Sequence, residues 1–397
     1  MTTSAFNIQL FVWLLLAAFF VSLAAQKLHI PYAIALALAG LVIGALNLFP
    51  GARLEPSLML TILLPPLLFE TAIHLKAESL HRDWKPITLL TFGGTIGSMF
   101  LIAGLAHLIM HLPLSQAALF GALISATDPV SVVAIVKTMG GHARLTFMME
   151  AESLFNDGVS VVLFSVALGM ASGHKLSWWK APEQFLWLIL GGFLLGAFIG
   201  WIASMLHHQI DDHLVELTLT TLTAYGSYLL AEALHMSGVT AVVATGLLIG
   251  NLGLEKSMSE STRTAVHAFW EYAAFVANSL VFLLIGIEVT HISWSSHWVL
   301  ALSAPCVALA GRLIVYPLIL LSNRIGDPIP FKWAGLFWWG GLRGALSMAM
   351  VLSLPENSGG RELLLICTFG TVLFSLLIQG LTLRPINQHR KWSAIEI

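Results

Sequence analysis

The stretch SATDP at residues 125–129 lies inside a long apolar segment, and ESLFND at residues 152–157 lies inside the next one. These two motifs place Asp128, Glu152 and Asp157 where a bilayer would be. A carboxylate at that depth costs about 3 kcal/mol or more unless it is paired, hydrated or bound to an ion. We therefore expect the three acids to belong to a working site inside the membrane.

The composition predicts an integral membrane protein. Of the 397 residues, 57% are hydrophobic and 10% are charged, with a mean hydropathy of +0.85, whereas soluble domains carry roughly 25% charged residues. The first apolar run, at about 6–25, is expected to stay as a helix, because residues 1–5 contain no Lys or Arg of the kind that precedes a signal peptide. We predict one all-α polytopic domain over residues 1–397, with no separate soluble domain.

Thirteen apolar segments recur along the chain, and most approach the roughly 20 residues that a membrane helix needs. Their approximate ranges are 5–25, 30–48, 57–74, 87–110, 114–138, 145–171, 184–206, 213–235, 237–252, 265–290, 296–322, 332–355 and 361–384.

The loop charges predict an orientation. With the N-terminus outside, thirteen of the 19 Lys and Arg residues fall on the cytoplasmic side and four on the outer side. The other two, Arg312 and Arg343, lie within predicted helices. An excess of basic residues marks cytoplasmic loops, so we expect the N-terminus outside and the C-terminus in the cytoplasm.

Two segments are expected to be interrupted near mid-membrane. Pro129 removes a backbone donor and pushes the preceding residue out of helical geometry, so Thr127 and Asp128 should lie at a kink with free carbonyls. A purely structural proline kink is the alternative interpretation. The glycines of GGLRGA at residues 340–345 predict a second interruption. One broken helix in each half is typical of transporters with inverted repeats and an ion site between them.

The polar side chains of the segment at 145–171 share helix faces. Ser153 and Asp157 are four residues apart, as are Glu152 and Asn156, so each pair lies on one face.

Three further charged residues need an explanation. Arg312 and Arg343 lie about 15 Å and about 17 Å from the cytoplasmic ends of their segments, so each requires a buried partner. Glu152 is a candidate partner for Arg312. Glu70 lies near the cytoplasmic end of its segment, and it is either part of the site or an interfacial acid that reaches water.

Four ordered motifs resemble the monovalent cation:proton antiporters of the NhaP type, prokaryotic relatives of animal sodium/proton exchangers. They are SATDPV at 125–130, ESLFNDGV at 152–159, NSL at 278–280 with FLLIG at 282–286, and GGLRGA at 340–345. The resemblance spans nearly the whole chain. It implies a fold of thirteen helices with a dimer-forming domain and a moving core domain.

The same resemblance implies a role for each site residue. Asp157 would bind either Na⁺ or a proton, with oxygen ligands for the cation from Ser153, Thr127 and Glu70. The expected structural residues are Asp128 and Asn156 at the helix crossing, Glu152 paired with Arg312, and Arg343 at the second interrupted helix.

The resemblance also implies a function. We expect exchange of Na⁺, and also Li⁺, for H⁺ by alternating access across a prokaryotic inner membrane, with a role in pH homeostasis. Asn156 stands where electrogenic relatives have a second aspartate, so a one-for-one, electroneutral exchange is expected. The expected partners are membrane lipid and a second copy of the chain, without nucleic acid and without any cofactor besides the transported ions.

Three other interpretations stay open. A K⁺/H⁺ exchanger has the same motifs, and a passive cation channel also needs intramembrane acids. An intramembrane enzyme has less support, because no His-Glu-x-x-His motif is present. We also expect the histidines at 207–208 and 213 to form a solvated loop rather than a pH sensor or metal site.

Overall fold

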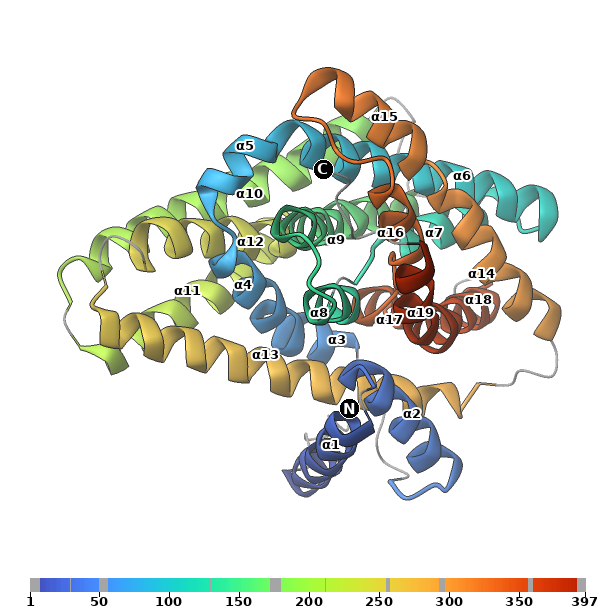
Figure 1. The fold of residues 1–397 in the computed structure, drawn as a ribbon, viewed down its shortest axis with the longest axis horizontal. Helices are drawn as coiled ribbons and strands as arrows, with labels where there is room; N and C mark the ends of the chain where they lie inside the picture. Colours follow the sequence, from blue (N-terminus) through green and yellow to red (C-terminus); the bar gives the residue numbers. More distant parts are fainter. Residues whose placement is uncertain are drawn as a thin grey trace.

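A computed structural model describes residues 8–28, 30–49, 56–128, 130–171, 180–210, 212–254, 258–292, 297–355 and 360–390. All regular elements within these ranges are helical, and one isolated antiparallel bridge joins Asp128 to Leu342. The all-α prediction is confirmed for this part of the chain. Figure 1 shows the helices coloured along the sequence.

The first half of the chain forms nine α-helices and two π-helical turns within these ranges. They are α1 (Ile8–Leu28), α2 (Tyr32–Ala45), α3 (Pro56–Leu58), η1 (Met59–Leu63), α4 (Leu64–His74), α5 (Ala77–Thr88), η2 (Leu89–Gly93), α6 (Gly94–Ile109), α7 (Leu114–Ser125), α8 (Val130–Thr138) and α9 (Ala143–Ala171).

The second half continues the same pattern. Its described elements are α10 (Ala181–His207), α11 (His213–Ala233), α12 (Gly238–Leu248), η3 (Ile249–Leu254), α13 (Glu260–Val289), α14 (Trp298–Arg312), α15 (Val315–Ile325), α16 (Trp333–Trp339), α17 (Ala345–Leu352), α18 (Arg361–Phe374), η5 (Ser375–Gly380) and α19 (Leu381–Arg390).

Seven of the described helical stretches are long and apolar enough to cross a membrane, and four shorter apolar stretches accompany them. The membrane class predicted from the composition is thus matched by the lengths of the helices. The count of thirteen crossings and the inverted repeat stay predictions.

Two segments differ from their predicted bounds for an identifiable local reason. The segment expected at 87–110 begins at Ala77, because the polar residues of α5 extend the helix beyond the apolar run. The segment expected at 296–322 divides into α14 and α15 at residues 313–314. Pro317 follows this break, and a proline ring crowds the carbonyl four residues before it, here that of Leu313.

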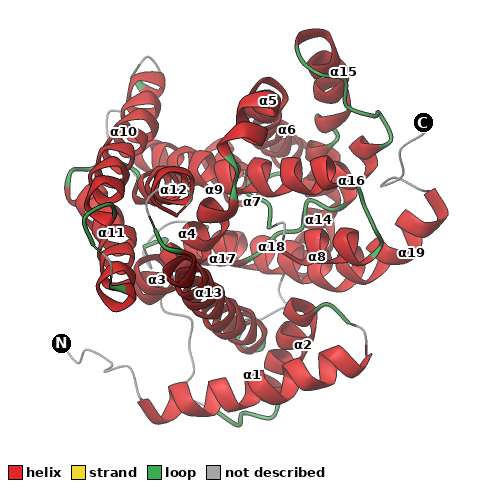
Figure 2. Cartoon of the chain, turned by 60° about the vertical axis from the view of Figure 1, so that its left-hand side comes forward, coloured by secondary structure: helices red, strands yellow, loops and turns green. Residues whose placement is uncertain are grey.

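The helix contacts fall into two sets. The first helix group, α1–α4 with η1 and α10–α13 with η3, is held together by contacts such as α13 with α2 and α12 with α4. The second helix group, α5–α9 with η2 and α14–α19 with η5, is held by contacts such as α6 with α7 and α14 with α18. Figure 2 shows α10, α11 and α12 on one side of the molecule and α14, α16 and α19 on the other.

The longest helix, α13, supports the first group by crossing α2 closely. Gly40 and Gly286 face each other at this crossing, and a Cβ on Gly40 would lie 3.0 Å from the Gly286 Cα. Small residues let membrane helices approach in this way.

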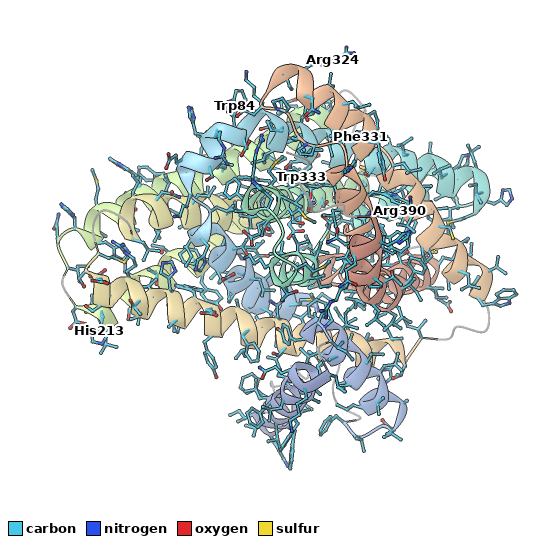
Figure 3. All side chains as sticks on the ribbon, viewed as in Figure 1. Trp84, His213, Arg324, Phe331, Trp333 and Arg390 are labelled. Atoms are coloured by element: carbon cyan, nitrogen blue, oxygen red, sulfur yellow. The ribbon has the colours of Figure 1, made fainter. Side chains whose placement is uncertain are left out.

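Buried and peripheral side chains separate as expected for a helical bundle. Trp333 is 1% exposed and lies among the helices, whereas His213 and Arg324 lie at the margins of the ribbon (Figure 3). Three of the buried charged residues, Glu152, Arg312 and Arg343, lie on α9, at the end of α14 and between α16 and α17.

Candidate functional site

The two interrupted helices meet at the centre of the second helix group. α7 ends at Ser125 and α8 begins at Val130, while α16 ends at Trp339 and α17 begins at Ala345. The Asp128 N–H donates to the Leu342 carbonyl at 2.8 Å, which forms the antiparallel bridge. Both predicted interruptions are confirmed, although Pro129 itself lies outside the described residues.

Side chains hydrogen-bond three carbonyls at the first interruption, and the expectation of a free carbonyl is wrong for Thr127. The carbonyl of Ala126 accepts from Arg343 Nη1 at 2.7 Å, and that of Thr127 accepts from Ser153 Oγ at 2.7 Å. Ser347 Oγ donates to the Leu123 carbonyl at 2.6 Å. Helix interruption orphans backbone acceptors, and here side chains from neighbouring helices satisfy them.

The predicted pair of Glu152 and Arg312 is present. Arg312 Nη2 lies 3.2 Å from Glu152 Oε1 and 3.3 Å from Oε2, and both residues are buried. Arg312 Nε also donates to the Phe337 carbonyl at 3.2 Å. The pair therefore ties α9 to the end of α14 and to α16.

Arg343 has a backbone carbonyl, and not a carboxylate, as the hydrogen-bond partner of its guanidinium in the described part of the chain. Its guanidinium donates to the carbonyl of Ala126, and its backbone N–H donates to Ser375 Oγ at 3.1 Å. Arg343 thus connects the two interruptions to each other and to η5.

Asn156 organises Thr127 through a chain of hydrogen bonds. Asn156 Nδ2 donates to Thr127 Oγ1 at 2.7 Å and to Glu152 Oε1 at 3.2 Å, while its Oδ1 accepts from the Thr127 N–H at 3.3 Å. Thr127 Oγ1 lies 3.0 Å from Ser153 Oγ. Because Ser153 donates to the Thr127 carbonyl, the Thr127 hydroxyl is the donor in that contact.

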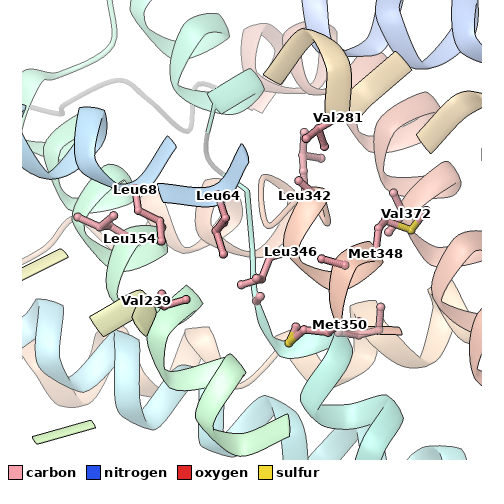
Figure 4. Packing of buried hydrophobic residues seen from close by; sticks show 14 of the residues in the cluster. Leu64, Leu68, Leu154, Val239, Val281, Leu342, Leu346, Met348, Met350 and Val372 are labelled. Carbon is pink, nitrogen blue, oxygen red and sulfur yellow. The ribbon is translucent and has the colours of Figure 1, made fainter. Parts of the chain in front are cut away.

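A cavity of about 90 Å³ lies between the two helix groups. The second group contributes Thr127, Asp128 and Asp157 to its lining, and the first group contributes Glu70 from α4 and Asn278 from α13. Its apolar wall includes Leu64 and Leu68 of α4, Leu154 of α9 and Leu346 of α17, which lie around one space in Figure 4.

The structure thus brings three of the four predicted cation ligands to one cavity. They are Glu70, Thr127 and Asp157. Ser153 is not among the lining residues and lies one hydrogen bond away, against Thr127. The structural residues Asn156, Glu152, Arg312 and Arg343 also lie outside the lining, and Asp128 lies within it.

Glu70 was expected to be either part of the site or an interfacial acid that reaches water, and its surroundings have features of both. Its side chain is 27% exposed, and its carboxylate lies 3.4 Å from His74 Nδ1, one turn along α4. It also lines the cavity. Glu70 therefore lines the cavity and is also partly exposed.

Three polar residues of the lining were not singled out for roles from the sequence: Thr71, Asn278 and Ser347. Asn278 begins one of the motifs quoted above, and with Ser279 it forms a polar pair within an otherwise apolar part of α13. That signal was available in the sequence, but the sequence does not show which way the side chain points.

The expectation of a solvated histidine loop is wrong for His207. This side chain is fully buried at the end of α10, and its Nδ1 lies 3.4 Å from Glu216 Oε2 of α11. Because helix α10 continues through residue 207, the first histidine packs against α11 instead of entering the loop. Across the described ranges, no three His, Cys, Asp or Glu side chains converge as metal ligands.

Comparison with known proteins identifies extensive similarity. The family model described as sodium/hydrogen exchanger, transmembrane, matches residues 14–389. The chain is 39% identical over 381 residues to the Na⁺/H⁺ antiporter NhaG of Bacillus atrophaeus, covering 91% of this chain and 71% of that protein. It is 37% identical over 388 residues to the Na⁺/H⁺ antiporter NhaH of Halobacillus dabanensis, covering 94% and 96%.

A solved structure has the same fold. The sodium proton antiporter MjNhaP1 from Methanocaldococcus jannaschii at pH 8 superposes with a TM-score of 0.78 at 22% identity, covering 96% of this chain and 98% of that one. At this identity the likeness concerns the fold alone.

Proposed function

Because the chain belongs to the sodium/hydrogen exchanger family, a family of membrane transporters and not of enzymes, we propose that it exchanges Na⁺ for H⁺ across the membrane. Asp157 is the exchange site. A cation binds its ionised form and a proton neutralises it, so the two ions exclude each other. Alternating access of the site to the two sides then couples the opposing fluxes.

The observation that carries this proposal is the location of the cavity. Its polar lining comes from both helix groups, with Asp157 and Thr127 on one side and Glu70 on the other. A site between two bodies changes its accessibility when one body moves against the other. We assign the first helix group to the dimer-forming domain and the second to the moving core.

The proposed Na⁺ shell consists of oxygen atoms, which sodium-sized hard cations prefer. Asp157 supplies the charge, and Thr127 and Glu70 supply further oxygens from the lining. Ser153 Oγ lies 3.0 Å from Thr127 Oγ1. We propose that it supplies the fourth oxygen of the shell, next to Thr127. Asp128 and Asn156 hold the crossing in place.

Electroneutral exchange is supported by the buried charges near the crossing. Three carboxylates, Asp128, Glu152 and Asp157, lie with two guanidiniums, Arg312 and Arg343. When all five are ionised, one negative charge is in excess within the second helix group, whereas Glu70 of the first group lies 3.4 Å from His74 Nδ1. A single Na⁺ or a single proton at Asp157 neutralises the excess in the second group, which favours a one-for-one exchange.

We propose further features on the basis of the sequence and its resemblance to the antiporter family. Li⁺ is a second substrate, the N-terminus lies outside and the C-terminus in the cytoplasm, and the protein is a homodimer in a prokaryotic inner membrane. Its role there is pH homeostasis.

A K⁺/H⁺ exchanger has the same motifs, and it is the second candidate because the cavity does not by itself discriminate between cations. A passive channel is disfavoured by the small volume of the cavity and by its position between two helix groups.

The test is cation-induced dequenching of a pH-sensitive dye in proteoliposomes that contain the purified protein. We expect Na⁺ and Li⁺ to release the proton gradient and K⁺ to do so weakly. Asp157→Asn should abolish the signal while the protein keeps its elution profile in detergent. Exchange at the wild-type rate by Asp157→Asn would refute the assignment, and a rate that depends strongly on membrane potential would refute electroneutrality.

A further inference from the structure

Asn278 is the polar residue that α13 presents to the cavity. The other lining residue from this helix is Ala274, one turn before it. Asn278 is half-buried, and it lies on the first helix group, whereas Asp157 and Thr127 belong to the second. The carboxamide therefore reaches the ion site from the opposing body.

The neighbouring hydroxyl groups of the lining are engaged with their own helices or with the crossing. Thr71 Oγ1 donates to the Leu67 carbonyl at 3.0 Å, and Ser347 Oγ donates to the Leu123 carbonyl at 2.6 Å. Thr71 Oγ1 also lies 3.4 Å from Glu70 Oε2. Both hydroxyl groups therefore have partners within the protein.

Asn278 differs from other asparagines in the chain. Asn251 Nδ2 donates to the carbonyls of Leu75 and Leu247, and Asn323 both donates to and accepts from Ile329. Within the described ranges the carboxamide of Asn278 has no hydrogen-bond partner in the protein. An amide without a partner costs free energy at membrane depth. A ligand that enters the cavity and contacts the carboxamide would remove this cost.

A transported cation fits this position. The carboxamide oxygen is a neutral, hard ligand of the kind that binds alkali and alkaline-earth cations. It adds coordination without adding negative charge, so it leaves the one-for-one charge balance of the site unchanged.

Resting on the antiport function proposed above, we infer that Asn278 is a further ligand of the cation and a determinant of cation affinity. Its oxygen completes the shell opposite Asp157 in the conformation described here. Because the two residues lie on different helix groups, movement of one group against the other removes this ligand and weakens binding, which assists release.

The test compares two changes at this position with a matched control. Asn278→Ala removes the ligand, and Asn278→Asp is isosteric and replaces it with a carboxylate. Ser279→Ala is the control, because it removes the hydroxyl of the next residue on α13, which donates to the Phe275 carbonyl at 2.7 Å and is not among the lining residues. Each full-length variant is reconstituted, and the dependence of dye dequenching on Na⁺, Li⁺ and K⁺ concentration gives KM and the maximal rate.

We expect Asn278→Ala to raise the KM for Na⁺ about tenfold, equivalent to about 1.4 kcal/mol of binding, with the maximal rate within about twofold of wild type. Asn278→Asp should lower the KM and slow the maximal rate, because a second carboxylate holds the cation. Ser279→Ala should leave the KM unchanged.

Two results would overturn the inference. One is a wild-type KM in both Asn278 variants, and the other is a loss of maximal rate at constant KM, which would assign the residue to helix packing. If Asn278→Ala does not fold, the isosteric Asn278→Asp still decides the question through its KM. Absence of any Na⁺-dependent signal in the wild-type protein would instead refute the antiport function itself.

Discussion

Gly344 lies directly against the carboxylate of Asp128, so that a Cβ added to Gly344 would be 2.5 Å from Asp128 Oδ2. The second interrupted helix thereby reaches the first at a position without a side chain. Backbone pairing of Asp128 with Leu342 depends on this approach.

Gly344→Ala should therefore separate the two interruptions. The added methyl group cannot be accommodated without moving Asp128, so we expect exchange to fall at least tenfold and the thermal midpoint in detergent to drop. Gly104→Ala is the control, because a Cβ there meets no atom within 4 Å. Equal behaviour of the two variants would contradict the close approach.

Removing one member of the buried ion pair should be worse than removing both. Glu152→Gln leaves the Arg312 guanidinium buried without its carboxylate, which costs about 3–5 kcal/mol. The double variant Glu152→Gln with Arg312→Gln removes both charges and should recover part of the thermal midpoint. A double variant less stable than Glu152→Gln would show that Arg312 is held mainly by its bond to the Phe337 carbonyl.

Asn156→Asp should destabilise the protein in a pH-dependent way. The change deletes the donations to Thr127 Oγ1 and Glu152 Oε1, and it brings two carboxylates together at about the 3.2 Å of the present contact. Lost buried hydrogen bonds cost about 1–3 kcal/mol. Protonation removes the repulsion, so the thermal midpoint should fall further below wild type at pH 8 than at pH 5.

The same chemical change at Asn278 provides a control for Asn156→Asp. Asn278 lines the cavity and has no partner among the described residues, so its replacement by aspartate should lower the thermal midpoint less. A larger drop for Asn278→Asp than for Asn156→Asp would reverse the roles that we assign to the two amides.

Arg144 should be the more important of two arginines that contact Asp83. The Asp83 carboxylate is fully buried, and it accepts from Arg144 Nε at 2.9 Å and Nη2 at 2.7 Å. Arg144 Nη1 also donates to the Pro328 carbonyl at 3.0 Å, which links α5 and α9 to the loop before α16. Arg144→Ala should therefore cost about 3 kcal/mol.

Arg82→Ala is the control for this prediction. Arg82 contacts the other Asp83 oxygen at 3.0 Å, but its side chain is 52% exposed. An exposed partner contributes about 0–1 kcal/mol. Thermal midpoints in detergent should thus separate the two variants, and equal midpoints would mean that the loop contact contributes little.

Local sequence was sufficient for the parts of the site that depend on one helix. The glycines of GGLRGA at 340–345 and the proline after Asp128 predicted both interruptions. The four-residue spacing in α9 predicted the shared faces, and depth along the helices suggested Glu152 as the partner of Arg312. The spacing of residues on a helix and their depth along it can both be counted from residue numbers, so the sequence is enough to predict them.

Other features required the crossing of helices far apart in the chain. Arg343 has a carbonyl partner 217 residues away, and that carbonyl is therefore not free. Asn278 reaches the cavity, and His207 is buried against Glu216, because of how α13 and α10 are rotated about their axes. Helical periodicity is weak where a helix is apolar on every side, so the sequence does not indicate that rotation.

The sequence by itself determined that this chain crosses a membrane, that it belongs with the cation:proton antiporters, and which carboxylates lie at membrane depth. Apolar length and motif order are sufficient for those conclusions. Only the tertiary structure decided which oxygens face the cavity and which are engaged by the protein. That choice depends on hydrogen-bond distances between helices, and these are set by how the two groups pack against each other.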